Sequence, residues 1–544
     1  MKKFPCFARK PVDVFNRSST KLSCLQQSFR GLFSSLFYFL AFQVSPFWNQ
    51  LGYFITVSLL GFMALKVSKP KTTSFMPSDV DVFFTSVSAS TVSSMSAVEM
   101  EVFSNSQLVI MTVLMLVGGE IFTSMLGLQF VRSKYTRKAN RENEAHLASI
   151  DYKSPNSKIS FDQIELGLVT LPQAQNEQPC SNLEKGIEAS CDEDLKYHSI
   201  KCLGYVVLFY LLVVHVVGSA LIVLYLNLVP SAREVLKNKG LRILTFSVFT
   251  VVSTFSNCGF IPTNENMVVF KKNSGLLLIL IPQILLGNTL FAPSLRFVIW
   301  VLVKITRRVE FNYLLNNSRE ISYDHLLPGL YSCLLAITVF GFILVQLLLL
   351  CFMEWNSEDL AGLNAYQKIV GMLFQTANSR HSGESIFDLS DISPAVLVLF
   401  VLMMYLPPHT SFLPIDGGEK ALQKEERRTE KRKYVEHLLL SQLSYLVIFV
   451  ILVCIIEREK MKKDPLNFSV LNITIEIVSA YGNVGFSAGY HCNLQLKHEP
   501  RCKDLGYGFV GRWSNSGKFV LMFVMFFGRL KKFSMHGGRA WKLD

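Results

Sequence analysis

Four short turns in this 544-residue chain combine small residues with positions that suit unusual backbone geometry. They read SSMSAVE, SNCGFIP, SRHSGES and GNVGFSA, and their fourth or fifth residues are Ser96, Gly259, Gly383 and Gly485. Glycine permits dihedrals that side chains resist, and it leaves the space around the turn open. When such turns face one another, their carbonyl oxygens can replace part of the hydration shell of a cation. The turns therefore predict a cation-coordinating ring.

Charged residues flank two of these turns. Glu99 and Glu101 follow the first turn, where they could concentrate cations at a mouth; the alternative is that Glu99 holds a buried contact instead. Arg380 and Glu384 lie in the third turn. A charge facing the path of a cation would oppose its passage, so we expect Arg380 to brace the turn through Glu384 or a carbonyl.

Basic residues also occur near the end of the last apolar run. At 1.5 Å per residue, Arg529 lies roughly 18 Å into a helix that starts near Gly517, below the level of the turns. Charge inside a membrane is a functional-site hypothesis by default, which applies to Arg529 and Lys531. The alternative is that these side chains extend to the cytoplasmic interface, and this suits Lys532 best.

The eleven cysteines show no C-x-x-C spacing, so neither a zinc site nor a redox dithiol is predicted. Cys492 and Cys502 lie in a polar segment that we expect outside the membrane, where a disulfide is permitted. Asn467, in the tripeptide NFS, is a glycosylation acceptor only if its segment is external. We expect no cofactor, and no metal other than a transported Na+ or K+.

Apolar runs must position the turns, and eight of them approach the roughly 20 residues that a spanning helix needs. They cover residues 50–68, 106–131, 199–229, 274–303, 327–354, 394–413, 436–456 and 517–536. Between the two spans of each pair lies a shorter segment that carries one turn: 79–105, 241–267, 363–389 and 468–488. The predicted fold class is an all-α integral membrane protein with four span–pore-helix–span repeats around one central pore.

Composition supports a membrane protein. Half of the residues are hydrophobic and 17% are charged, below the roughly 25% of an average soluble domain. The net charge of +13 comes from basic clusters beside apolar runs, as the positive-inside rule expects of cytoplasmic loops. These clusters have no interleaved aromatic residues, so nucleic acid is excluded as a partner. Eight spans then place both termini in the cytoplasm.

The repeats define the predicted organisation of the chain. Its parts are a cytoplasmic tail with an interfacial segment (1–45), pore repeat 1 (46–133), a cytoplasmic loop (134–198), pore repeat 2 (199–305), a cytoplasmic loop (306–325), pore repeat 3 (326–413), a charged cytoplasmic loop (414–435), pore repeat 4 (436–538) and a cytoplasmic C-terminus (539–544).

These motifs resemble a known family. TVSSMSAVEMEVFSN, STFSNCGFIPTNENM, NSRHSGES, SAYGNVGFSAGY, YGFVGRWSNSGK and FFGRLKKF are similar to the pore segments of plant HKT transporters, in the Trk/Ktr/HKT superfamily. The resemblance implies passive Na+ transport across a plant plasma membrane, because the Na+-selective subfamily has serine at the first filter position, here Ser96. It also implies that Arg529 and Lys531 limit flux below the filter, and that the protein is a homodimer with a pore in each subunit.

Three alternatives compete with Na+ transport. K+ uptake or Na+–K+ symport would use the same fold, and the side chain at position 96 separates these activities. A gradient-coupled carrier would need repeats of alternating orientation, whereas two-span repeats all share one orientation. An enzyme would need a Ser/His/Asp or metal constellation, and no such motif occurs in the sequence.

Overall fold

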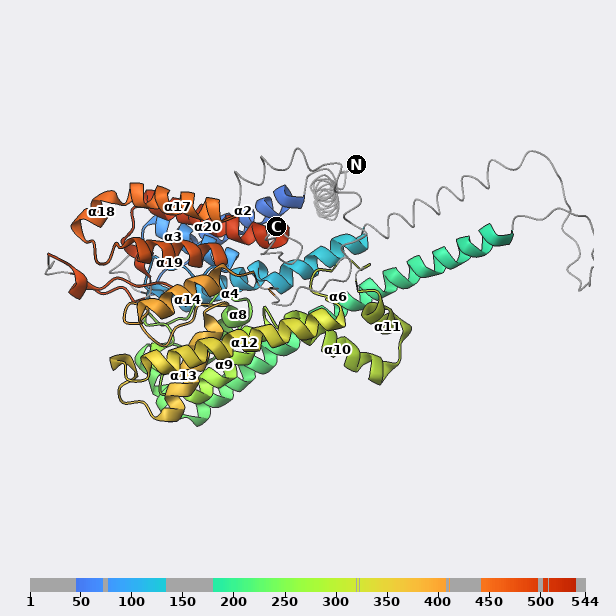
Figure 1. Ribbon diagram of the computed structural model, residues 1–544, viewed down its shortest axis with the longest axis horizontal. Helices are drawn as coiled ribbons and strands as arrows, with labels where there is room; N and C mark the ends of the chain where they lie inside the picture. Colours follow the sequence, from blue (N-terminus) through green and yellow to red (C-terminus); the bar gives the residue numbers. More distant parts are fainter. Residues whose placement is uncertain are drawn as a thin grey trace, which may run out of the picture. The chain divides into compact units, whose positions relative to one another are not determined.

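The computed structural model describes residues 46–71, 77–133, 180–318, 320–321, 323–407, 410, 442–497, 502–506 and 508–534, without the side chains of 46, 180–193 and 531–534. Among them, the regular structure is helical apart from one antiparallel bridge between Tyr490 and Leu505 (Figure 1). The chain divides into two compact units, residues 1–55 and 56–544. All of the contacts considered below lie within the second unit.

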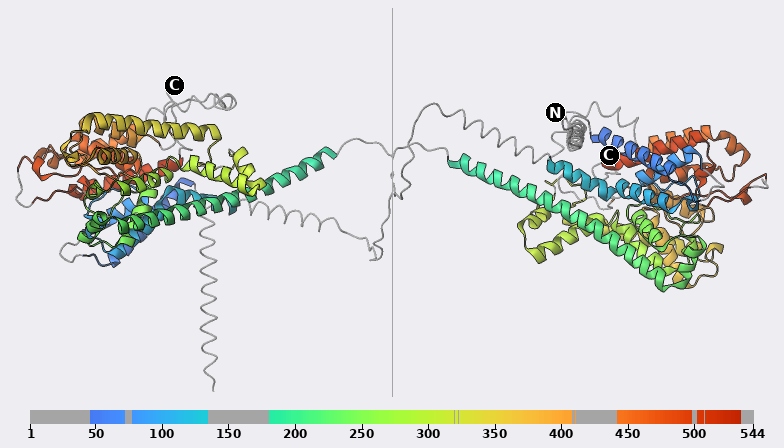
Figure 2. Two further views of the ribbon diagram at one scale, coloured as in Figure 1. Left: turned by 90° about the horizontal axis from the view of Figure 1, so that it is seen from below. Right: turned by 180° about the vertical axis from the view of Figure 1, so that it is seen from behind.

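Three described helices are long and apolar enough to cross a bilayer. They are α2 (Pro46–Val67), α6 (Cys180–Leu228) and α12 (Gly329–Glu354). With 49 residues, α6 is much longer than a bilayer requires, and Figure 2 shows it as an unbroken rod in both views. Each of the three helices contains one of the predicted first spans, since they include most of residues 50–68, 199–229 and 327–354.

Two predicted spans, 106–131 and 274–303, are bent. The axis turns by 53° between α4 (Asn105–Gly118) and the helix Glu120–Ser133, and by 83° between α9 (Ser274–Leu286) and α10 (Phe291–Thr306). Glycine lies at both breaks: Gly119 has an extended ψ of 145°, and Gly287 caps α9. Small residues permit such kinks. Counting each bent pair as one span raises the number of described spans to five.

The remaining predicted spans are only partly described. α14 (Pro394–Tyr405) and α17 (Gln442–Ile456) are short apolar helices, and the rest of the predicted spans 394–413 and 436–456 lies mainly outside the described residues. α20 (Asn515–Ser534) covers the predicted span 517–536 except for its last two residues. The structure therefore supports a helical membrane protein that crosses the bilayer several times.

Four short helices occupy the predicted pore segments. They are α3 (Asp79–Thr91), α8 (Ile243–Phe255), α13 (Ala365–Asn378) and α19 (Val470–Gly482). Three of them have 13 residues and α13 has 14, so each is about 20 Å long and too short to cross the roughly 30 Å hydrocarbon core. Each one ends at the turn that the sequence singled out.

Close backbone approach fixes three of these helices against the second long helix of their own repeat. A Cβ added to Gly118, Gly287 or Gly528 would overlap a carbonyl group near the end of the short helix. The carbonyls belong, in the same order, to Ser90, Phe255 and Tyr481. The same packing at the same register in three repeats indicates that the repeats share one architecture.

Candidate functional site

The four short helices end in the same hydrogen-bonded turn. In each turn, one backbone amide donates to the carbonyl three residues earlier. The donating amides are those of Val92 (3.3 Å), Asn257 (3.2 Å), His381 (3.0 Å) and Asn483 (3.2 Å). Two residues after the donating amide, each turn has a residue with positive φ: Ser94 (53°), Gly259 (83°), Gly383 (65°) and Gly485 (103°). This shared geometry sets the register of the four repeats independently of side-chain identity.

The register changes the first predicted filter residue. When the four turn sequences are written under one another, Ser96 matches the three glycines. In the structure, Ser94 occupies the position equivalent to these glycines, two residues after Val92. Ser96 lies beyond the turn, and its hydroxyl donates to the carbonyl of Val98 at 2.8 Å. The run SSMS offers serines two residues apart, so its letters alone do not separate these positions. The end of α3 would have separated them.

The turns contact one another in a closed order. A Cβ on Gly259 would overlap the carbonyl of Ser382, and one on Gly485 would overlap Ser94. A Cβ on Gly383 would lie 2.7 Å from the carbonyl carbon of Gly485. The circle closes where the thiol of Cys258, beside Gly259, lies close to the backbone of Ser94. The four turns therefore surround one axis, and the C-terminal ends of four helices, which carry partial negative charge, adjoin it.

Two buried carboxyl groups support the turns from behind. Glu384, which follows Gly383, accepts a 2.5 Å hydrogen bond from the hydroxyl of Thr254 on α8 and so links repeats 3 and 2. Glu476, on α19, accepts from the Ser487 hydroxyl at 2.5 Å and from the Ala488 amide at 3.1 Å. Glu476 was not predicted, because an acidic residue within an apolar run carries no sign of where its partners lie.

Arg380 and Glu384, the predicted bracing pair, have different partners. The Arg380 guanidinium donates to the carbonyl of Pro407 and lies 5.1 Å from the centre of the Phe342 ring. It therefore ties the third turn to the end of α14 and to α12. Glu384 contacts Thr254 instead. Of the two expected partners for Arg380, a carbonyl is the one that the structure supplies, and it lies outside the turn.

The acidic residues after the first turn are paired with lysines. The Lys503 ammonium contacts the Glu99 carboxylate, and Lys239 lies 2.7 Å from Glu101. Asn264 joins the two acids, since its side chain donates to Glu99 at 3.3 Å and its backbone amide donates to Glu101 at 3.2 Å. Lys503 therefore compensates the charge of Glu99, whereas Lys239 is shared between Glu101 and Glu265, which also lies 2.7 Å from it.

Arg529 reaches from repeat 4 to repeat 1 near the short-helix ends. Its guanidinium is 1% exposed, donates to the carbonyl of Gly118 at 2.5 Å and lies 4.0 Å from the Glu120 carboxylate. The preceding residue, Gly528, packs on the last turn of α19. The side chain of Lys531 lies outside the described residues.

The segment after the fourth turn contains a disulfide between Cys492 and Cys502, whose Cα atoms are 5.9 Å apart. Asn467 lies beneath it and is 1% exposed. Its side-chain nitrogen donates to Asp464 and to the His491 carbonyl, each at 2.9 Å. A glycan would require this nitrogen to be exposed, so the fold does not accommodate glycosylation there.

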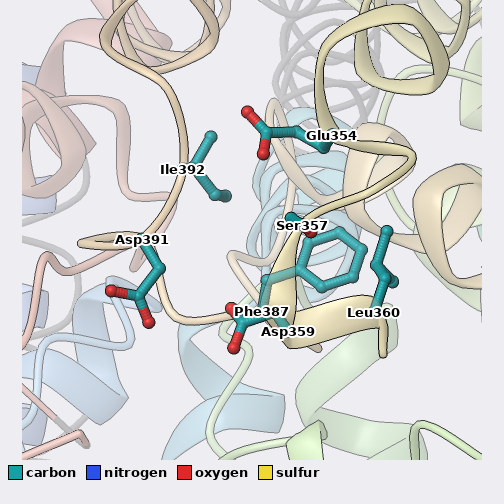
Figure 3. Close-up of a pocket in the computed structure, with 7 residues that line it drawn as sticks. All are labelled: Glu354, Ser357, Asp359, Leu360, Phe387, Asp391 and Ile392. Carbon is teal, nitrogen blue, oxygen red and sulfur yellow. The ribbon is translucent and has the colours of Figure 1, made fainter. Parts of the chain in front are cut away.

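A separate pocket lies beyond the third turn, between the end of α12 and the segment that leads to α14 (Figure 3). Its lining includes three acidic residues, Glu354, Asp359 and Asp391. The Glu354 carboxylate accepts a 2.9 Å hydrogen bond from the Ser393 amide. Burial and the nearby charge of Asp391 raise the pKa of Asp359. In the described part of the chain, no three or more His, Cys, Asp or Glu residues are grouped to hold a metal ion.

Comparison with known proteins identifies the family. A family model described as "Cation transport protein", TrkH, matches residues 184–411 and 417–543. Cation transporter HKT1;3 of Oryza sativa subsp. japonica is 48% identical over 540 residues, which are 99% of this chain and 97% of that protein. Sodium transporter HKT1 of Arabidopsis thaliana is 51% identical over 485 residues, 88% of this chain and 92% of that protein.

Similarity extends at a lower level to a fungal protein. Potassium transporter TRK1 of Candida albicans is 26% identical over 380 residues, 64% of this chain and 33% of that protein. The family model covers more than half of the chain, and the plant relatives match along nearly their whole length. The chain therefore belongs to the TrkH family of cation transport proteins and, within the Trk/Ktr/HKT superfamily, to the plant HKT transporters.

Proposed function

We propose that this protein carries Na+ passively and selectively across the plasma membrane, through a filter formed by Ser94, Gly259, Gly383 and Gly485. The observation that carries the proposal is the register: a serine holds the positive-φ position in one turn, and glycines hold it in the other three. A Cβ and a hydroxyl in one quadrant make the ring unequal. Poorer coordination penalises K+, while Na+ can pass with part of its water retained. The name of the Arabidopsis relative supports this choice of ion.

The proposal includes eight spans around one pore, with both termini in the cytoplasm and the electrochemical gradient as the driving force. Arg529 and Lys531 limit flux below the filter, and two subunits form a homodimer in which each has its own pore. The buried guanidinium of Arg529, held between Gly118 and Glu120, supports a role close to the filter.

The second candidate function is K+ uptake or Na+–K+ symport in the same fold. Its support is the fungal relative, which is named a potassium transporter, together with the three glycine quadrants of the ring. The two candidates differ in how the serine quadrant treats K+.

Reversal potentials in voltage-clamped oocytes test the proposal, with external Na+ exchanged for K+. The variants are Ser94→Gly and its matched control Ser96→Gly, which removes a serine two residues away. We expect the wild-type potential to follow external Na+ by about 59 mV per tenfold change, as expected for a monovalent ion. Ser94→Gly should begin to follow K+, and Ser96→Gly should behave as wild type.

Each opposite result has its own meaning. A shift toward K+ in Ser96→Gly alone would restore the register that the sequence predicted and refute the assignment of Ser94. A wild-type protein that follows K+ as well as Na+ would favour the K+ uptake or symport candidate.

A further inference from the structure

A segment of repeat 4, which the proposed topology places outside the membrane, lies directly against the residues that follow the first filter turn. A Cβ added to Gly508 would overlap the carbonyl of Ser96. The next residue, Phe509, donates its backbone amide to the Ser487 hydroxyl at 2.9 Å, just beyond the fourth filter turn. The segment that precedes Gly508 is therefore held next to the outer side of the filter.

Several contacts fix residues 502–505 of this segment. The disulfide joins Cys502 to Cys492, and the amide of Cys492 donates to the Asp504 carboxylate at 2.7 Å. Tyr490 and Leu505 pair through two backbone hydrogen bonds of 2.9 and 3.2 Å. The position of the intervening Lys503 is therefore set by the backbone, independently of any contact made by its own side chain.

Lys503 uses this position to reach repeat 1. Its ammonium contacts the carboxylate of Glu99, a residue 404 positions away in the sequence and five residues beyond Ser94. The Glu99 side chain is 22% exposed and also accepts from Asn264 of repeat 2, whereas the Lys503 side chain is 71% exposed. An exposed lysine is thus brought to the first acidic residue after the first filter turn.

We propose that Lys503, placed by the Cys492–Cys502 loop, neutralises Glu99 and thereby lowers the local cation concentration at the outer mouth. It acts as a positioned charge that sets the rate of cation entry. The inference rests on the proposed function only in requiring that external cations enter through this filter. It does not require that Na+ be preferred over K+.

Electrostatics sets the size of the effect. A unit charge about 7 Å from an aqueous path changes the energy of a monovalent cation by about RT in water, which corresponds to a two- to threefold change in occupancy. Because the Debye length is about 10 Å at 0.1 M salt and about 30 Å at 0.01 M, the effect is large at low ionic strength and shrinks as salt is added. An exposed ion pair contributes little to stability, so the loss of Lys503 should not unfold the protein.

The first test compares Lys503→Gln with Lys497→Gln, an exposed lysine in the same loop. Inward conductance per surface-expressed molecule is measured in oocytes at fixed external Na+, with ionic strength varied by exchanging sorbitol for choline chloride. We expect Lys503→Gln to raise conductance by about two- to threefold at low ionic strength, with a smaller effect at high ionic strength. Lys497→Gln should change it less. An unchanged Lys503→Gln, or an increase that does not depend on salt, would overturn the proposal.

A charge cycle separates this role from a structural one. Glu99→Gln leaves Lys503 uncompensated and should lower conductance, and the double variant should lie between the two single variants. If the ion pair only holds the mouth together, both single variants should lower conductance, which would contradict the proposal. Absence of cation current in the wild type would refute the proposed function itself, whereas wild-type current with an unchanged cycle would refute only the role of Lys503.

The loop is tested by external dithiothreitol, which reduces the disulfide to two thiols and is itself oxidised to its cyclic disulfide. Release of the loop should raise the wild-type conductance at low ionic strength and leave Lys503→Gln unchanged. An equal response in both proteins, or no response in the wild type, would overturn the positioning role of the loop.

Discussion

The close packing of Gly118, Gly287 and Gly528 on the ends of the short helices leads to a quantitative prediction for Gly528. An added Cβ would overlap the Tyr481 carbonyl oxygen, although real Cβ atoms stay at least 3.0 Å from such an atom. Both groups belong to packed helical backbone, so α20 must move away from the end of α19. The substitution Gly528→Ala therefore acts on α19, the helix that ends in the fourth turn.

The magnitude follows from two opposing terms. Overpacking costs about 1–3 kcal/mol, and the upper value applies here because the obstacle is backbone. Replacing glycine by alanine within a helix returns about 1 kcal/mol, so Gly528→Ala should destabilise the protein by about 2 kcal/mol. Gly341→Ala is the matched control: Gly341 lies within α12, and an added Cβ would meet nothing within 4 Å. It should stabilise the protein by up to about 1 kcal/mol, which leaves a difference of about 3 kcal/mol between the variants.

The assay is thermal unfolding of the detergent-solubilised protein, with current per surface-expressed molecule as a second readout. Gly528→Ala should lower both Tm and current, and Gly341→Ala should lower neither. Gly118→Ala and Gly287→Ala should follow Gly528→Ala, because they meet the equivalent carbonyls of repeats 1 and 2. Equal Tm values for Gly528→Ala and Gly341→Ala would refute the close packing at Gly528. They would also refute the shared repeat architecture that was inferred from this packing.

Two further predictions concern charged groups. The His491 ring lies 3.4 Å from the Asp388 carboxylate. The hydrogen bond between them raises the pKa of His491. Burial alone would raise the pKa of Asp388, but the hydrogen bond from His491 lowers it. The pair is therefore fully formed between about pH 4 and pH 6.5, and its contribution is lost as pH rises through the raised pKa of His491 or falls through the lowered pKa of Asp388. His491→Gln should lower Tm at pH 5.5 and have little effect at pH 9, and equal losses at both pH values would contradict this. At Arg529, a unit charge about 8 Å from a cation costs about 2 kcal/mol at an effective dielectric constant of 20, a factor of about 30 in rate. Arg529→Gln should therefore raise current by up to about thirtyfold, while Arg529→Lys should not. Glu120→Gln removes the carboxylate that partly neutralises Arg529, so it should lower current. Unchanged current in Arg529→Gln would exclude a flux-limiting role for Arg529.

Sequence patterns predicted the helical elements well because hydrophobic length reports burial in a bilayer. Each short helix lies inside its predicted segment; α8, for example, covers residues 243–255 of the expected 241–267. The apolar runs continue through the bends after Gly118 and Gly287, so hydrophobicity alone does not indicate where the axis turns. Hydrophobicity records how much chain is buried and is insensitive to the direction of its axis.

The site was predicted less completely, since its geometry depends on contacts between distant residues. The glycines of the second, third and fourth turns are conspicuous in the sequence, whereas Ser94 and Ser96 are equivalent until the end of α3 is known. The partners of Arg529 and Lys503 belong to repeat 1, hundreds of positions away. Such pairs follow from the way in which the turns meet, and no local pattern of residue types encodes that meeting.

The ring of four turns is drawn from a single chain, and this has a genetic consequence. Where four identical subunits build such a ring, one mutation alters all four quadrants at once. Here a single codon alters one quadrant, as the serine at position 94 and the glycines of the other turns illustrate. Under the proposed filter function, a lineage can therefore change ion preference one quarter of the ring at a time, and three quadrants remain intact while the fourth varies.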